Sequence, residues 1–210
     1  TQPSDLTFNN DGTKMFVLGY YGDDVNEYSL STAFDVSSAS FAGNSERFSV
    51  ASQESNPSGI AFNNDGTKMF ITGYDGDDVN EYSLSTAFDV STSNYIQNFS
   101  VSAQETNPTS ISFNNDGTKM FILGSTGDDV NEYSLSTAFD VSTASYVRIF
   151  SVQTQEIYPQ GLAFNNDGTK MFVVGTNGDD VNEYSLADNP STQTVCINSA
   201  ITNIIYSTTG

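Results

Sequence analysis

The chain has 210 residues, 37% of them hydrophobic, which is enough to bury the core of one sizeable domain, or of one domain and the start of another. Its 26 aspartates and glutamates outnumber six lysines and arginines, and with no histidine the formal net charge is −20 at pH 7. This charge excludes nucleic acid and anionic membranes as partners, and no apolar run is long enough for a membrane-spanning helix.

One sequence unit occurs four times along the chain. The motif Asn-Asn-Asp-Gly begins at Asn9, Asn63, Asn114 and Asn165, with spacings of 54, 51 and 51 residues. A repeat period of this length is typical of stacked or radially arranged structural units. The units start near residues 3, 57, 108 and 159, and the repeats cover residues 1–187.

Each unit is predicted to form four antiparallel strands, and the second unit shows them most clearly. Its strands are expected over Ser58–Phe62, Lys68–Gly73, Asp78–Leu84 and Tyr95–Val101. The Asn-Asp-Gly turn joins the first two strands, because glycine adopts the positive φ that such a turn needs. One turn of helix is expected within residues 85–91.

The second strand of each unit decides the architecture. In the first unit Met15, Phe16, Val17 and Leu18 are apolar at consecutive positions, so both faces of this strand must be covered. Near-identical four-stranded sheets that bury both faces against copies of themselves are the blades of a β-propeller. We therefore predict an all-β fold of four near-identical blades, either a complete four-bladed ring or part of a larger propeller.

The repeated motifs also carry a family resemblance. The segment NNDGTKMFV, followed further on by GDDVNEYSL, resembles the YVTN-type β-propeller repeats of secreted and surface proteins in bacteria and archaea. Asparagine stands where that family usually has proline, and the present unit is longer. The resemblance covers roughly residues 1–187, and it implies a propeller blade and a secreted, cell-surface location without implying a particular function.

The segment 188–210 differs from the repeats. After a polar linker, Thr194–Asn198 and Ile201–Ser207 are predicted strands, and the lone Cys196 lies in the first of them. The stretch TVCINSAITNIIYSTTG resembles the opening of the immunoglobulin-like modules of Bacteroidetes adhesins. The alternative is a closing strand for the last blade, since the fourth unit lacks a fourth strand of its own. With no initiating methionine or signal sequence at Thr1, we expect part of a larger multidomain chain.

In a propeller, the loops between the second and third strands of every blade gather on one face. The two residues before the glycine of each such loop vary between copies, while their neighbours stay constant. Loops on a rigid scaffold commonly carry recognition, so we predict a binding face for glycan or protein ligands; the alternative is neutral drift at exposed loop tips. The candidate ligand-binding residues are Tyr20, Tyr21, Tyr74, Asp75, Ser125, Thr126, Thr176 and Asn177.

The aspartate pairs beside these residues are candidate calcium ligands, because calcium takes several hard oxygen ligands. Their spacing matches neither an EF-hand loop nor the calcium-binding nonapeptide repeat, and an aspartate before a strand also fastens a turn to its own backbone. Calcium is thus the one cofactor that the sequence suggests, and turn stabilisation is the alternative. The candidate metal ligands are Asp23, Asp24, Asp77, Asp78, Asp128, Asp129, Asp179 and Asp180.

Sequence features of enzymes are scarce. The chain has no histidine, no Gly-x-Ser-x-Gly motif and no glycine-rich phosphate loop. Paired carboxylates can hydrolyse a glycosidic bond only when their environments differ, and fourfold repetition works against such asymmetry. The mid-strand glutamates are interpreted as members of structural hydrogen-bond networks with repeated Asn, Tyr, Ser or Lys side chains. They are Glu27, Glu81, Glu132 and Glu183.

The sequence therefore predicts a non-enzymatic binding or adhesion module of a secreted, cell-surface protein, with acidic variable loops that face glycan or protein ligands. An architectural spacer or fibre component without a specific ligand is the second hypothesis. A carboxylate-dependent glycan hydrolase or lyase is the third. No residue is assigned a catalytic role.

Overall fold

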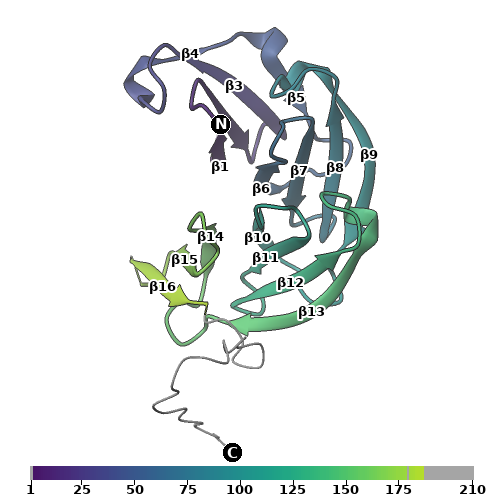
Figure 1. Cartoon of the computed structure of the whole chain (residues 1–210), viewed down its shortest axis with the longest axis vertical. Coiled ribbons are helices and arrows are strands. Elements are labelled where there is room, and N and C mark those ends of the chain that lie inside the picture. The colour runs from purple at the N-terminus through teal and green to yellow at the C-terminus, as the bar shows by residue number, and fades with distance from the viewer. Residues whose placement is uncertain (1, 179, 187–210) are drawn as a thin grey trace, which may run out of the picture.

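The computed structural model describes residues 2–178 and 180–186. Four antiparallel sheets are arranged around a common centre, with the first strand of each sheet innermost (Figure 1). The predicted all-β, four-bladed β-propeller is confirmed, and helix is limited to single turns in the described residues. None of these helices has the length and apolar character needed to cross a membrane. The strands predicted within 188–210 lie outside the described residues.

The four blades follow one another along the chain. Blade 1 contains β1 (Pro3–Phe8), β2 (Lys14–Gly19), β3 (Asp24–Leu30) and an outer strand divided into β4 (Ala39–Phe41) and β5 (Arg47–Ser49). Blade 2 contains β6 (Pro57–Phe62), β7 (Lys68–Gly73), β8 (Asp78–Leu84) and β9 (Ser93–Ser100). Blade 3 contains β10 (Pro108–Phe113), β11 (Lys119–Gly124), β12 (Asp129–Leu135) and β13 (Ala144–Ser151). The described part of blade 4 contains β14 (Pro159–Phe164), β15 (Lys170–Gly175) and β16 (Val181–Ser185).

The strands of blade 2 agree closely with the prediction. β7 and β8 have the predicted bounds, whereas β9 begins at Ser93 and ends at Ser100. A helical turn is predicted within residues 85–91, and the structure has a 3-10 turn only at the end of this segment, η3 (Val90–Thr92). Asp89 caps its start by accepting a hydrogen bond from the backbone N–H of Ser91. The other 3-10 turns are η1 (Val36–Ser38), η2 (Asn44–Glu46) and η4 (Val141–Thr143).

The turn between the first two strands of each blade is held by its own side chains. In blade 2, Gly66 has a φ of +71°, which is the left-handed conformation that favours glycine. The carboxylate of Asp65 accepts a hydrogen bond of 3.0 Å from the N–H of Thr67, and Asn63 Oδ1 accepts one of 2.9 Å from the N–H of Lys68. The same residues recur in every blade, so each turn closes in the same way.

The hydrophobic core lies between the blades. Phe16 of β2 packs on Phe62 of β6 with ring centroids 4.6 Å apart, and the equivalent rings are 4.6 Å apart at the next two junctions. Phe16 and Leu18 are fully buried. These two residues lie on the same side of β2. Both sides are covered in the equivalent strand β7, where the consecutive residues Met69 and Phe70 are fully buried, as the apolar run predicts. Each blade therefore has one face for the preceding blade and another for the following blade.

Buried ion pairs reinforce these junctions. The side chains of Glu27 and Glu81 are 4% and 1% exposed, and each lies 2.6 Å from the lysine of its own blade, Lys14 or Lys68. Lys14 Nζ also donates a hydrogen bond of 2.7 Å to the carbonyl oxygen of Phe88 in the next blade. Asn, Tyr, Ser and Lys side chains are the predicted donors to the mid-strand glutamates, and these two glutamates use lysine. The hydrogen bond of Lys14 to Phe88 also joins blade 1 to blade 2.

Candidate functional site

The predicted binding loops are fastened to the scaffold by buried glutamates. Glu54, which is 1% exposed, accepts hydrogen bonds from the backbone N–H groups of Asn56, Asp75 and Gly76. Burial raises the pKa of its carboxyl, while these hydrogen bonds lower it. Glu105 and Glu156 hold the equivalent loops of blades 3 and 4. The variable residues of blades 2, 3 and 4 therefore stand on loops that are held in the same way.

The predicted ligand-binding residues differ in chemical type between the blades. The aromatic ones gather at blades 1 and 2, where the rings of Tyr20 and Tyr21 are 5.1 Å apart and those of Tyr20 and Tyr74 are 6.2 Å apart. Tyr21 is 71% exposed. Blades 3 and 4 carry short polar residues at the same positions, namely Ser125, Thr126, Thr176 and Asn177.

The predicted calcium ligands divide into two structural groups. The first aspartate of each described pair has a positive φ of 46° to 51° and forms part of the turn: Asp23, Asp77 and Asp128. The second is at the start of the third strand or beside it and accepts a hydrogen bond from the asparagine two residues later: Asp24, Asp78, Asp129 and Asp180. Asp179 lies outside the described residues. Calcium at these pairs stays a prediction.

The second aspartate has a different partner in each blade. Asp24 pairs with Arg47 at 3.3 Å, and Asp78 accepts a hydrogen bond from Asn98. In blade 3 the residue equivalent to Arg47 and Asn98 is Ile149, which has no polar side-chain group to offer Asp129. Burial, followed by the charge of a neighbouring glutamate, raises the pKa of Asp129 to about 6.

A different group of carboxylates could hold a cation. Among the described residues, carboxylate oxygens of Glu27, Glu46 and Asp89 lie within 4.8 Å of one another at the junction of blades 1 and 2. At the next junction Gln97 stands in place of Glu46 and donates hydrogen bonds of 2.9 Å to both neighbouring carboxylates. An uncharged donor there removes the charge repulsion that the three carboxylates of the first junction retain.

The clearest break in the fourfold repeat lies at the axis. Asp5 of β1 pairs with Leu18, and the residues at the same place in the other blades are Gly59, Ser110 and Gly161. Its carboxylate bridges two blades, because Oδ1 accepts a hydrogen bond of 2.8 Å from the N–H of Leu6 and Oδ2 accepts one of 2.9 Å from the N–H of Ile60.

Asp5 also has an unusual affinity for protons. Burial raises the pKa of its carboxyl to about 6, although the two backbone hydrogen bonds lower it. A carboxylate with this pKa is largely ionised at pH 7 and accepts a proton more readily than an ordinary aspartate.

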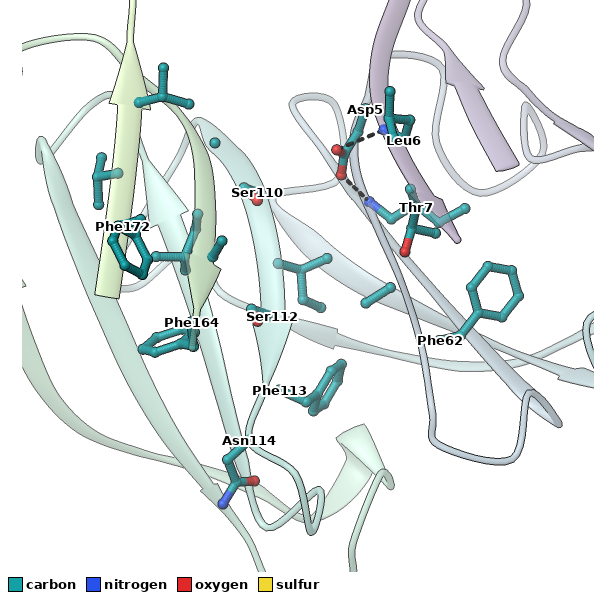
Figure 2. Close-up of a pocket in the computed structure, with 18 of the residues that line it drawn as sticks. Asp5, Leu6, Thr7, Phe62, Ser110, Ser112, Phe113, Asn114, Phe164 and Phe172 are labelled. Carbon is teal, nitrogen blue, oxygen red and sulfur yellow. Dashed lines mark hydrogen bonds between the residues drawn. The ribbon is translucent and has the colours of Figure 1, made fainter. Parts of the chain in front are cut away.

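Asp5 lines a cavity along the inner strands. The cavity has a volume of about 630 Å³ and is bounded by residues of all four blades. Figure 2 shows Asp5 with its two hydrogen bonds on one side and Phe164 and Phe172 on the other. The hydroxyl-bearing residues Thr7, Ser110 and Ser112 are polar members of the lining, so the cavity combines one carboxylate, hydroxyl groups and apolar walls. This is the usual composition of a small-molecule site, and its volume lies in the usual range.

Asp5 lies outside the repeated motifs, so the sequence patterns that predict the candidate sites do not include it. A comparison of the four units at the position of Asp5 reads Asp, Gly, Ser and Gly, and this difference is visible in the sequence. That the position faces the axis, and that the carboxylate contacts a second blade, needs the tertiary structure.

The positive charges of the chain are all engaged. Each of the six lysine and arginine side chains lies within 3.3 Å of a carboxylate oxygen. None of them lines the cavity at the axis. The described part of the site therefore offers no cationic side chain to an anionic substrate.

Comparisons with solved structures identify the fold. A candidate 6-phosphogluconolactonase of Bacteroides fragilis is 16% identical with a TM-score of 0.62, over 87% of this chain and 50% of that one. The periplasmic gluconolactonase of Pseudomonas aeruginosa is 14% identical with a TM-score of 0.54, over 86% of this chain and 48% of that one. The β-propeller domain of Cps50 (Swd1) from Myceliophthora thermophila is 10% identical with a TM-score of 0.56, over 88% of this chain and 54% of that one.

These likenesses establish a propeller fold, and the chain spans about half the length of each of the three proteins. No protein-family model and no curated protein matches the sequence. The neighbours correct two predictions, the non-enzymatic binding or adhesion module and the absence of enzymatic activity, because two of them are named for the hydrolysis of sugar lactones. Asp5 supplies the asymmetry between carboxylates that the fourfold repeat was expected to exclude.

Proposed function

We propose that this chain is part of a β-propeller hydrolase that opens an uncharged sugar lactone, with Asp5 as the general base. The observation that carries the proposal is the single unrepeated carboxylate at the axis, in a cavity of about 630 Å³ and with a pKa raised to about 6. The lactonase names of two structures with the same fold support this reaction class.

The proposed reaction uses the proton affinity of Asp5. A water molecule beside the ionised carboxylate attacks the carbonyl carbon of the lactone and gives its proton to Asp5. The ring C–O bond breaks, and the departing oxygen takes that proton to become a hydroxyl group. The new carboxylic acid then ionises to solvent, and Asp5 is left ionised for the next cycle. General base catalysis of this kind contributes roughly 10²- to 10⁴-fold in rate.

The preference for an uncharged substrate follows from the electrostatics. The chain has a net charge of −20, and its six cationic side chains are all paired with carboxylates. A phosphorylated lactone would enter this field without a positive partner, which is unfavourable. The hydroxyl groups of Thr7, Ser110 and Ser112 suit the hydroxyl groups of a sugar ring.

The predicted glycan contact of Tyr20, Tyr21 and Tyr74 stays a prediction, and we assign these rings to the outer part of the substrate path. Tyr20 follows Gly19, which pairs with Pro3 at the start of β1, so the tyrosine lies at the end of the blade where β1 begins. A sugar could pack an apolar ring face on these side chains. The predicted secreted, cell-surface location likewise stays a prediction.

The test is hydrolysis of glucono-δ-lactone, followed as acid release in a pH-stat above the uncatalysed rate. We expect Asp5→Asn to lower kcat/KM by at least about 100-fold, and Tyr74→Ala to raise KM with a smaller effect on kcat. Glu46→Gln is the matched control, because blade 2 already has glutamine at this position and the residue lies outside the cavity. A wild-type rate equal to the uncatalysed rate, or full activity in Asp5→Asn, would refute the proposal.

A further inference from the structure

The two ends of the blade series expose surfaces that every internal junction buries. We define the leading face as the side of a blade that packs on the following blade, and the receiving face as the side that packs on the preceding blade. At the junction of blades 1 and 2, the leading face contributes Phe16, Leu18 and Val25 to the shared core, and the receiving face contributes Ile60 and Val90. Between blades 2 and 3 the equivalent positions again form the shared core, except that Thr72 stands in place of Leu18.

The receiving face of blade 1 is uncovered among the described residues. Val36 is 63% exposed, whereas its equivalents Val90 and Val141 are fully buried. Leu6 is 54% exposed, whereas its equivalent Ile60 is 4% exposed. Transfer of such side chains out of water is the main stabilising contribution at the internal junctions, and blade 1 lacks it on this side.

The leading face of blade 4 is uncovered in the same way. Val181 is 67% exposed and Val174 is 43% exposed, whereas Val79 and Leu123, their equivalents on internal leading faces, are fully buried. Lys170 and its partner Glu183 are also about half exposed, and Lys170 has no carbonyl of a following blade to bind within the described part of the chain.

These two surfaces are complementary, because they are the two halves of the internal junction. Asn10 Nδ2 donates a hydrogen bond of 2.6 Å to the carbonyl oxygen of Asn64, and the same bond at the next two junctions joins Asn64 to Asn115 and Asn115 to Asn166. Over residues 2–178 and 180–186, the series leaves the side-chain amide of Asn166 without a following carbonyl and the carbonyl of Asn10 without an incoming amide.

We propose that the uncovered faces bind a second copy of this chain, so that two four-blade series close into one ring. Each copy supplies one leading face and one receiving face, and a two-fold axis lets both junctions form at once. The four blades superimpose on about half of a larger propeller domain, so their curvature leaves room for a second series of the same size. Leu6, Val174 and Val181 also line the axial cavity, so closure would cover this part of its wall.

Charge opposes this association and gives it a signature. Two chains with a net charge of −20 each repel one another at low ionic strength, whereas the apolar faces are insensitive to screening. We therefore expect the dimer to become tighter as salt concentration rises.

The experiment is sedimentation equilibrium of the whole chain over a range of protein and salt concentrations. The expected result is a species of twice the 22.6 kDa mass of one chain. Val36→Lys and Val181→Lys should each give monomers, because each removes one partner from both junctions. Both sites are highly exposed in the single chain, so the variants should keep its circular dichroism spectrum. Val147→Lys, at a 49% exposed apolar residue on the outer strand of blade 3, is the matched control and should stay dimeric.

Mixing the two variants separates ring closure from general stickiness. One intact receiving face and one intact leading face then remain, so the mixture should associate through a single junction, more weakly than the wild type and more strongly than either variant alone. A wild-type monomer at all concentrations would overturn the proposal, since the faces would then belong to other blades. Polymers longer than a dimer would overturn ring closure, and dimers in both lysine variants would place the contact elsewhere.

Discussion

Replacement of Asp5 by asparagine should make the stability difference between wild type and variant depend on pH. In the folded protein burial raises the pKa of the Asp5 carboxyl from 3.8 to about 6. Between these pH values the folded state binds more protons at this site than the unfolded state does. The free energy of unfolding of the wild type therefore falls as pH rises through this window. The stabilising contribution of the proton on Asp5 is fully present only below pH 3.8.

The size of the effect follows from the two pKa values. A rise from 3.8 to about 6 corresponds to about 3 kcal/mol at about 1.4 kcal/mol for each pH unit, and solvent screening of a half-buried carboxyl makes this an upper value. The asparagine side chain does not ionise, so the variant lacks this contribution. At pH 7 the variant should therefore be at least as stable as the wild type. Its advantage is reduced by about 1 kcal/mol, because the amide nitrogen of asparagine cannot accept one of the two backbone hydrogen bonds.

The assay is urea unfolding at several pH values between 4 and 7.5, followed by far-ultraviolet circular dichroism because the chain has no tryptophan. The difference between wild type and variant cancels the titration of other groups. Asp11→Asn is the control with the opposite sign, because hydrogen bonds from Thr13 lower the pKa of Asp11. A wild-type advantage over Asp5→Asn that is the same at pH 4 and pH 7 would refute the buried, proton-binding state of Asp5 and with it the proposed base.

Two further predictions compare equivalent positions in different blades. Lys68→Met should cost roughly 3–5 kcal/mol because it leaves the buried Glu81 unpaired, whereas Lys170→Met, with an exposed partner, should cost less than about 1 kcal/mol; equal losses in urea unfolding would contradict this. Gly66→Ala should lower the melting temperature more than Gly168→Ala. Both residues have φ near +70°, which costs alanine about 1–2 kcal/mol, but a Cβ at Gly66 meets a phenylalanine ring at 2.2 Å, and at Gly168 it meets nothing within 4 Å among the described residues.

The sequence determined the individual blade. The consecutive apolar residues of β7 and the Asn-Asp-Gly turn before it gave strand bounds that the structure reproduces from Lys68 to Leu84, since both signals are local and are repeated four times. The same locality explains why the mid-strand glutamates could be recognised as structural, because their lysine partners recur with them.

Tertiary structure decided what happens between the blades. Asp5 and Ile60 are 55 residues apart, and only the approach of the inner strands brings the carboxylate of one to the N–H of the other. The exposure of Val36 and Val181 is equally invisible in a repeat whose internal copies bury the same residues. A repeated unit specifies one blade and one junction, but the number of blades in a ring and the residue that breaks its symmetry depend on how the units are placed around the axis, and that placement is set by packing between surfaces far apart in the chain.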